Sequence, residues 1–434
     1  MSIYSAMNSG VSGLAAQSAK FSAISDNIAN SGTVGYKRTN VQFATLVTNN
    51  SSAGTYSAGG VEASLRTEVS RGGIVTRSTV ATDLAISGNG FFVVGTNIDS
   101  NNIQGTTHLL TRGGSFRPDA NGNLMNTGGY YLQGWPLDNT GQVIGGGDPS
   151  RTSFEGLQTV SLGSLTGTAQ ATTEITFAAN LPASKTVEAP GQPFSTSIDY
   201  YSPLGFTSKL ELEWVPNPNP APPPPAVATP SNMWTLNVKD GNTTIQTVQI
   251  EFNDGIGANV PAGRIKSMDT GTNGVIPLTL NSGQEIQLNL GENGAGLTQW
   301  GDQYAPGTIN KDGAGYAPLD RVEIGSDGVL TAIYRNGLRQ AAYKLPVANV
   351  TNPDGLIRAD GNAFQVSRAS GDFYLWDAGA GSAGTIDGGA LEASNVDIAE
   401  ELTSIIETQR AYSSNAKIIQ TADEMMDEIT RLMR

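Results

Sequence analysis

Apolar residues at helical spacing occupy both ends of the chain, and this pattern constrains the fold more than any other feature. Near the C-terminus they recur every seven positions from Leu391 to Met426, and no glycine or proline interrupts the run. This spacing predicts an amphipathic helix over 397–433, roughly 55 Å long at ~1.5 Å per residue. Ser394-Asn395, with Asp397 in the first turn, provides an N-cap setting for its start.

A shorter helix is predicted over 3–29, where Asn30-Ser31-Gly32 supplies residues that tolerate left-handed backbone angles and end it. An amphipathic helix cannot bury its apolar face alone, so we expect the two helices to pack on each other and on neighbouring copies of the chain. Packing of the helical pair on its own globular domain is the alternative that periodicity leaves open. The residues predicted to form the polymerisation interface are Met7, Val11, Leu14, Phe21, Ile24, Ile28, Leu391, Ile398, Leu402, Ile405, Tyr412, Ile419, Met426 and Ile429.

The middle of the chain has the pattern of β structure. Glycine accounts for 53 of 434 residues and charged residues for only 15%, which is typical of a turn-rich β protein. Apolar and charged residues alternate in KLELEWV at 209–215, as in a strand with one buried face. The stretch PNPNPAPPPPAVATP at 216–230 is too rich in proline for helix or strand, so we expect a stiff loop between strands that carry Trp214 and Trp234.

Composition excludes several classes of function. The chain has no cysteine and one histidine, His108, so thiolate nucleophiles, disulfides and Cys-containing zinc sites are excluded. The net charge is −14 and no run of Lys or Arg exceeds two residues, which argues against a nucleic-acid partner. Neither a membrane-spanning apolar run nor a secretory signal peptide is visible. These exclusions remove much of the enzyme repertoire, and we predict no enzyme activity, no catalytic or metal site and no cofactor.

The order of these patterns predicts a nested, multidomain fold. It is mainly β with α-helical termini: the N- and C-terminal helices pair in coiled-coil fashion, and an outer β domain is inserted in an inner one. The predicted parts are a terminal helical domain, 1–30 with 397–434; a connecting region, 31–72 with 366–396; an inner β domain, 73–152 with 303–365; and an inserted outer β domain, 153–302. Within the connecting region, 49–60 is rich in Ser, Gly and Asn, and we expect it to order only through contacts.

The stretch SDNIANSGTVGYKRT at 25–39 lies at the joint between the N-terminal helix and the β body. Gly35 and Tyr36 are predicted to turn the chain outward. Lys37 and Arg38 are predicted to pair with acidic residues of a neighbouring C-terminal helix. The candidates are Glu400, Glu401 and Glu407.

These stretches resemble the bacterial flagellar axial family of rod and hook proteins. SGLAAQSAKFSAISDNIANSGTVGYKRTNVQF is similar to the family's N-terminal signature, ATDLAISGNGFFVV and LTRGGSFRPDANGNL to its next two motifs, and GALEASNVDIAEELTSIIETQRAYSSNAKIIQTADEM to its C-terminal signature. The similar parts, about 1–45, 70–135 and 320–434, cover over half the chain. The signature residues at the joint are Asn27, Asn30, Gly35, Tyr36 and Lys37.

Distal rod proteins usually lack an insertion like 153–302, so the resemblance implies a hook subunit. It implies a homo-oligomeric helical polymer, a curved and flexible tube that acts as a universal joint and transmits motor torque from rod to filament. The implied partners are the hook cap, the distal rod protein, the hook–filament junction protein and the type III export apparatus. The implied location is extracellular, in the flagellar hook, after export without a cleaved signal peptide; no nucleic acid and no membrane insertion are implied.

Two alternatives are open. One is a distal rod subunit with an inserted domain, which would form a rigid drive shaft. The other is a secreted carbohydrate-active β protein, although Glu211 and Glu213 share a strand face with Lys209, as in a solvated surface. The groups that such a protein could use are Trp214, Trp234, Trp300, Asp199, Glu211 and Glu213.

Overall fold

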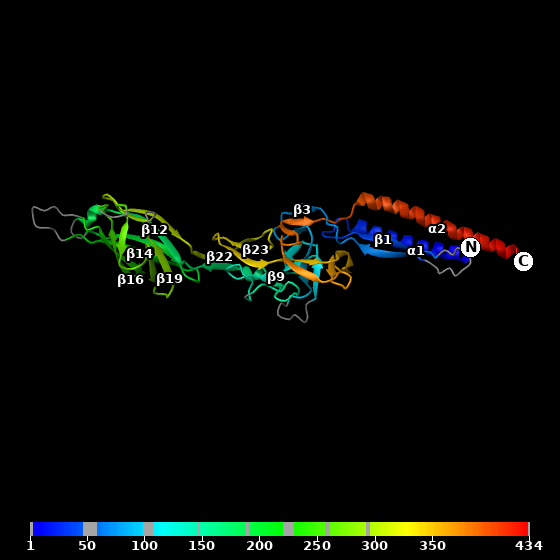
Figure 1. The fold of residues 1–434 in the computed structure, drawn as a ribbon, viewed down its shortest axis with the longest axis horizontal. Helices are drawn as coiled ribbons and strands as arrows, with labels where there is room; N and C mark the ends of the chain where they lie inside the picture. Colours follow the sequence, from blue (N-terminus) through cyan, green and yellow to red (C-terminus); the bar gives the residue numbers. More distant parts are fainter. Residues whose placement is uncertain are drawn as a thin grey trace, which may run out of the picture. The chain divides into compact units, whose positions relative to one another are not determined.

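The computed structural model of the chain is mainly β with helical termini, as predicted (Figure 1). It forms two compact units: unit 1 comprises Met1–Leu165, Arg321–Ile333 and Arg339–Arg434, and unit 2 comprises Thr166–Asp320 and Tyr334–Leu338. Unit 2 begins and ends later in the chain than the segment 153–302 expected from composition. The structure describes residues 3–46, 59–98, 107–145, 147–187, 191–219, 230–256, 261–291 and 296–432. The segment 49–58 and most of the proline-rich stretch lie outside the described residues.

In unit 1, helix α1 (Ile3–Ala29) ends in a turn whose carbonyl oxygens accept hydrogen bonds from side chains as well as from the backbone. Asn30 Nδ2 donates to the Asp26 carbonyl oxygen at 2.9 Å, and Ser31 Oγ donates to the Ile28 carbonyl oxygen at 2.8 Å. The same two carbonyl oxygens also accept backbone N–H groups, from Asn30 at 3.0 Å and Ser31 at 3.3 Å, so the side chains reinforce the last turn. The predicted position of the helix end is confirmed, but neither Asn30 nor Gly32 takes the left-handed backbone angles expected there; Gly35 is the first residue to do so.

Helix α2 (Ile398–Leu432) begins at an N-cap one residue before its first turn. Asp397 Oδ1 accepts hydrogen bonds from the backbone N–H groups of Ala399 at 2.9 Å and Glu400 at 3.3 Å. The cap is therefore Asp397 and not Ser394-Asn395, because the Asn395 side chain is used elsewhere: its Oδ1 accepts from the Arg38 backbone N–H at 2.7 Å.

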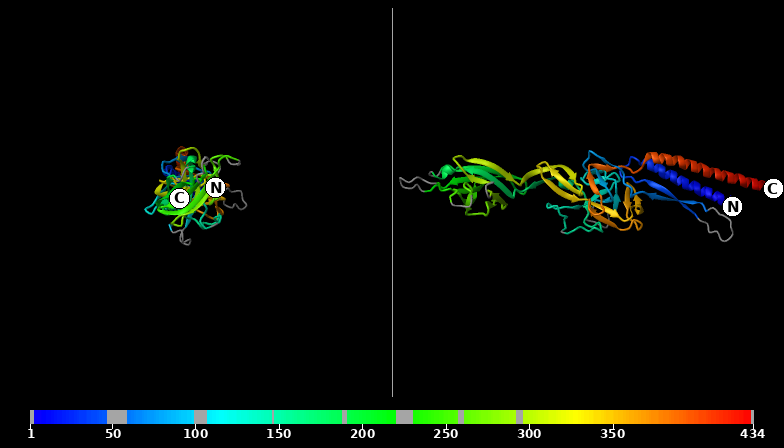
Figure 2. Two further views of the ribbon diagram at one scale, coloured as in Figure 1. Left: turned by 90° about the vertical axis from the view of Figure 1, so that its left-hand side faces the viewer. Right: turned by 45° about the horizontal axis from the view of Figure 1, so that its top comes forward.

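Helix α1 lies between α2 and an antiparallel hairpin of β1 (Thr39–Thr45) and β2 (Val61–Thr67) (Figures 1 and 2). The approach is close on both sides. A Cβ atom on Gly13 would lie 2.7 Å from Asn415 Nδ2 of α2, and one on Gly60 would lie 2.5 Å from Ser12 Oγ of α1. Small residues on α1 and in the hairpin thus permit three elements to pack tightly.

The β body of unit 1 is built around β5, which is buried at every position. Neighbouring strands run in the order β23-β24-β9-β5-β6-β27-β26, and β25 pairs with β5 and β28. Two short ribbons, β3 with β30 and β4 with β29, complete it. The bounds are β3 (Val75–Arg77), β4 (Leu84–Ser87), β5 (Phe91–Gly95), β6 (His108–Thr111), β7 (Phe116–Pro118), β8 (Leu124–Asn126), β9 (Tyr131–Pro136), β10 (Gln158–Thr159), β23 (Val329–Tyr334), β24 (Arg339–Lys344), β25 (Pro346–Val350), β26 (Ile357–Ala359), β27 (Ala363–Gln365), β28 (Phe373–Asp377), β29 (Thr385–Gly388) and β30 (Ala390–Glu392).

Unit 2 is a sandwich of two sheets, β13-β14-β15-β16-β17 and β18-β19-β12-β20, whose inner faces share one core. Leu210, Leu212 and Trp214 on β14 are fully buried in it, as their alternation predicted. Strands β14 and β15 form the hairpin expected on either side of the proline-rich stretch. The bounds are β11 (Gly167–Gln170), β12 (Glu174–Leu181), β13 (Phe194–Tyr201), β14 (Thr207–Pro216), β15 (Met233–Asp240), β16 (Thr243–Phe252), β17 (Ile265–Met268), β18 (Val275–Thr279), β19 (Glu285–Asn289), β20 (Leu297–Gln299), β21 (Ala305–Lys311) and β22 (Ala314–Ile324).

Candidate assembly surface

Helix α2 faces α1 through small and polar side chains. Glu401, Thr408 and Ala422 are its buried residues, and Asn415 meets Gly13 of α1. We call these four residues of α2 the seam residues; they are seven positions apart. Each lies three positions after a member of the apolar series Ile398, Ile405, Tyr412 and Ile419. The two glycines of α1 permit close approach at two neighbouring positions: Gly13 faces Asn415 of the seam, and Gly10 faces Ile419 of the apolar series beside it.

Large apolar side chains of both helices consequently remain exposed in the single chain. Tyr412 is 47% exposed and Leu402 51%, at positions where a self-contained helical pair would bury apolar groups. Contiguous exposed apolar surface marks interaction sites in proteins that fold as monomers. The exposed large apolar residues of the two helices are Tyr4, Val11, Phe21, Ile398, Leu402, Ile406, Tyr412, Ile418, Met425, Ile429 and Leu432.

The residues predicted for the polymerisation interface fall into three groups. Ile24 is buried within its own chain, and Leu391 lies on β30 opposite Thr76, so neither shares the exposed helical surface. Ile406 lies outside the predicted set, and only its exposure identifies it. Half-buried predicted residues are Met7, Leu14, Ile28, Ile405, Ile419 and Met426, and exposed ones are Val11, Phe21, Ile398, Leu402, Tyr412 and Ile429.

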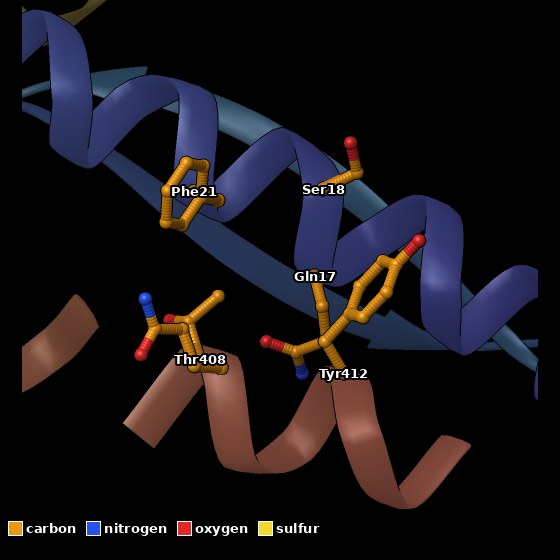
Figure 3. Close-up of a pocket in the computed structure, with 6 residues that line it drawn as sticks. Gln17, Ser18, Phe21, Thr408 and Tyr412 are labelled. Atoms are coloured by element: carbon orange, nitrogen blue, oxygen red, sulfur yellow. The ribbon is translucent and has the colours of Figure 1, made fainter. Parts of the chain in front are cut away.

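A groove of about 380 Å³ lies between the two helices. Figure 3 shows Phe21 of α1 and Tyr412 of α2 reaching toward the facing helix on this side of the pair. The lining combines these rings with amide and hydroxyl groups. The lining residues are Gln17, Ser18, Phe21, Thr408, Gln409 and Tyr412.

At the joint, Asn27 connects the end of α1 to the start of β1. Its side chain donates to the Thr39 carbonyl oxygen and accepts from the Thr39 N–H, both at 2.9 Å, which is the pattern of a paired backbone strand. The Tyr36 hydroxyl lies 3.0 Å from Asp26 Oδ2 and 3.2 Å from Asn27 Oδ1, two acceptors for its one hydrogen. Burial, together with the Asp26 carboxylate, raises the pKa of the Tyr36 hydroxyl.

Gly35 makes the turn that brings this segment against the β body. Its φ is +69°, and a Cβ atom there would lie 2.6 Å from the Gly113 nitrogen. The Gly35 N–H donates to the Glu392 carbonyl oxygen at 2.9 Å. Only glycine adopts this conformation in so small a space without strain.

Lys37 enters a buried ion cluster inside unit 1. Its Nζ lies 2.6 Å from Glu392 Oε1, and Arg112 lies 3.0 Å from Glu392 Oε2. The Gly73 N–H also donates to Oε1 at 2.8 Å. Burial lowers the pKa of Lys37 despite the carboxylate, whereas for Glu392 the nearby Arg112 and Lys37 outweigh burial and lower its pKa. Two cations thus share one anion.

Arg38 pairs with the N-terminal turn of α2 in its own chain. The Arg38 guanidinium lies 2.8 Å from Glu400 Oε1 and 2.5 Å from Glu401 Oε1, the second contact at an angle that makes no hydrogen bond. Two of the three predicted acids therefore meet Arg38, but within one subunit. The pairing predicted for Lys37 is wrong, because its partner is Glu392, which is near Lys37 only in the folded chain.

The groups proposed for a carbohydrate-active protein do not converge. Trp214 and Trp234 are buried in the core of unit 2, while Trp300 is exposed. Glu213 lies 2.9 Å from Lys239 Nζ and accepts from Asn237 at 3.0 Å. These residues stabilise a sandwich and its surface.

Three family models match the chain. "Flagella basal body rod protein" matches residues 7–37, "Flagellar hook protein FlgE/F/G D1 domain" matches 85–187, and "Flagellar basal body rod FlgEFG protein C-terminal" matches 387–432. They cover the helical ends, the joint and part of the β body. No helix in the described part of the chain is both long enough and apolar enough to span a bilayer.

Full-length relatives match as well. The flagellar hook protein FlgE of Brucella abortus biovar 1 (strain 9-941) is 36% identical over 437 residues, with 100% of each chain covered. That of Escherichia coli (strain K12) is 32% identical, covering 98% of this chain and 100% of its own. A crystal structure of Helicobacter pylori flagellar hook protein FlgE2 aligns with a TM-score of 0.46 at 15% identity, over 72% of this chain and 98% of that one. The chain belongs to the flagellar hook protein FlgE family, structural and non-enzymatic proteins of the flagellar rod and hook group.

Proposed function

We propose that the chain self-assembles into the curved, flexible tube of the flagellar hook, where it acts as a universal joint between rod and filament. The hook cap, the distal rod protein, the hook–filament junction protein and the type III export apparatus are its partners in this proposal. Its place is the extracellular flagellum, reached by export without a cleaved signal peptide.

The exposed apolar surface of α1 and α2 is the observation that carries the proposal. A single chain leaves these side chains in water, so burying them against other copies supplies a driving force for association. Each fully buried Leu, Ile, Phe or Met side chain contributes roughly 1.5–3 kcal/mol. Several such residues on each helix give a contact strong enough to bear torque.

Bending requires contacts that exchange at low cost. The solvent-facing side of β13, for example, carries Ser195, Ser197 and Asp199, and that of β16 carries Thr247 and Gln249. Hydrogen bonds between such groups contribute only about 0.5–1.5 kcal/mol each, since water replaces them readily. Polar contacts between the β structures of neighbouring copies can therefore break and re-form while the contacts between helices persist.

The test is electron microscopy of the purified full-length chain under polymerising conditions. Curved tubes are expected, whereas straight rigid tubes would favour the distal rod alternative. A deletion of 400–434 should leave soluble β units, with circular dichroism of a β protein, that no longer polymerise. Tubes formed by this deletion variant would refute the role of the terminal helices.

A further inference from the structure

A cavity of about 330 Å³ lies beside the buried ion cluster of Lys37, Arg112 and Glu392 in unit 1. Arg112 belongs both to the cluster and to the lining of the cavity, and among the described residues no Asp or Glu lines it. The polar side chains of the lining are Ser70, Asn89, Arg112, Asn349 and Thr351. The cavity therefore joins a buried cation to neutral amide and hydroxyl groups.

The guanidinium of Arg112 has hydrogen-bond donors to spare. Its Nη1 donates to the Ile86 carbonyl oxygen at 3.2 Å and to Glu392 Oε2 at 3.0 Å, and its Nη2 donates to the Gly88 carbonyl oxygen at 2.7 Å. A guanidinium carries five N–H donors, so these three bonds leave two. One of the two is on Nε, which makes no hydrogen bond within the described part of the chain.

The charge of the buried cluster is also unbalanced. Lys37 and Arg112 are both buried and share the single carboxylate of Glu392, which leaves the three side chains with a net charge of +1. Burial, together with the charge of Arg112, lowers the pKa of Lys37, so the second cation is costly to keep. A negative charge in the neighbouring cavity would compensate this excess.

The rim of the cavity offers further donors. The amide of Asn89 and the hydroxyl of Thr351 belong to exposed residues and make no side-chain hydrogen bond to the described residues. Asp354, which follows the lining in sequence, is already held by Arg66 at 3.2 Å and by the Ser70 N–H at 2.9 Å. A guanidinium, an amide and a hydroxyl around one cavity match the several oxygen acceptors of a phosphate or a carboxylate.

We propose that this cavity binds a small oxyanion, inorganic phosphate or a small carboxylate, as a counter-ion to Arg112. The site lies at the joint, because Lys37 comes two residues before β1 and Glu392 ends β30, the last strand before α2. An anion that binds only the folded chain stabilises it by mass action, so it would strengthen the attachment of both terminal segments to the β body. The inference does not depend on the proposed function, since a single chain forms the whole site.

Isothermal titration calorimetry of the full-length chain with inorganic phosphate, and separately with acetate, tests the site at an ionic strength held constant with sodium chloride. Sedimentation velocity identifies conditions in which the chain is monomeric. Asn89→Asp places a carboxylate at the rim without changing the size of the side chain. Asn242→Asp is the matched control, because Asn242 is an exposed residue of the turn between β15 and β16 in unit 2.

The wild type and Asn242→Asp should bind phosphate saturably, and Asn89→Asp should bind it about tenfold or more weakly, because its carboxylate repels the anion. Saturating phosphate should slow hydrogen exchange in peptides from β5 and β25 of the wild type, but not of Asn89→Asp. Binding of acetate as well would extend the site to carboxylates, and binding of phosphate alone would restrict it to phosphate. The absence of saturable binding of either anion to the wild type would overturn the inference, and so would phosphate binding that Asn89→Asp leaves unchanged.

Discussion

Replacing Glu392 by Gln tests the buried ion cluster directly. The Glu392 side chain is 1% exposed and contacts Lys37 at 2.6 Å and Arg112 at 3.0 Å. Gln preserves the size of the side chain but removes its charge, and leaves two cations buried without a counter-ion. Removal of one partner from a buried ion pair costs about 3–5 kcal/mol. We expect the free energy of unfolding of unit 1 to fall by up to that amount. Loss of the Lys37 proton would reduce the fall, because it removes one of the two buried positive charges.

Native-state hydrogen exchange with mass spectrometry measures this loss unit by unit. A change of 3–5 kcal/mol speeds exchange through global opening by about two to four orders of magnitude. Peptides from β5 and β25 of unit 1 should show it, and those from β14 and β15 of unit 2 should not. Glu323→Gln is the matched control, because Glu323 also faces two arginines, Arg321 and Arg339, but at the surface. An effect no larger than that of the control would refute the reasoning.

Three further predictions concern the joint. The pKa of the Glu392 carboxyl is lowered from 4.5, so its stabilising contribution is present above pH 4.5 and is lost as the pH falls through the pKa of the folded state. Urea titrations at a series of pH values should show this loss of stability in the wild type and a weaker pH dependence in Glu392→Gln. An equal pH dependence in the two proteins would contradict it. Asn27→Leu removes both hydrogen bonds to Thr39 and should destabilise unit 1 by about 2–4 kcal/mol in thermal denaturation; a loss under about 1 kcal/mol would be inconsistent with the geometry. Gly35→Ala places a Cβ atom within 2.6–2.8 Å of backbone atoms at a φ of +69° and should lower the free energy of unfolding by at least about 1–3 kcal/mol. Gly32→Ala is the control, because a Cβ atom there meets nothing within 4 Å, and it should change the melting temperature little. Equal effects of the two substitutions would argue against a conformational role for Gly35.

Much of the architecture follows from local sequence. The seven-residue spacing and the absence of glycine and proline were enough for α2, and Asn30-Ser31-Gly32 for the end of α1, since helix periodicity and capping depend on residues a few positions apart. Alternation along KLELEWV likewise placed Leu210, Leu212 and Trp214 in a core. The signature stretches also pointed to the rod and hook family, which full-length relatives then confirmed.

Pairings between distant residues were beyond local patterns. Lys37 and Glu392 are 355 positions apart, and nothing near either residue in the sequence distinguishes Glu392 from Glu400 or Glu407 as a partner. The face of α2 that meets α1 was also undetermined by periodicity. The most apolar series lies beside the seam of Thr408, Asn415 and Ala422, of which Asn415 packs against Gly13 of α1. Periodicity is a property of one segment, whereas a contact depends on the shape and charge of both surfaces, so only the folded chain decides which side chains remain for a second copy.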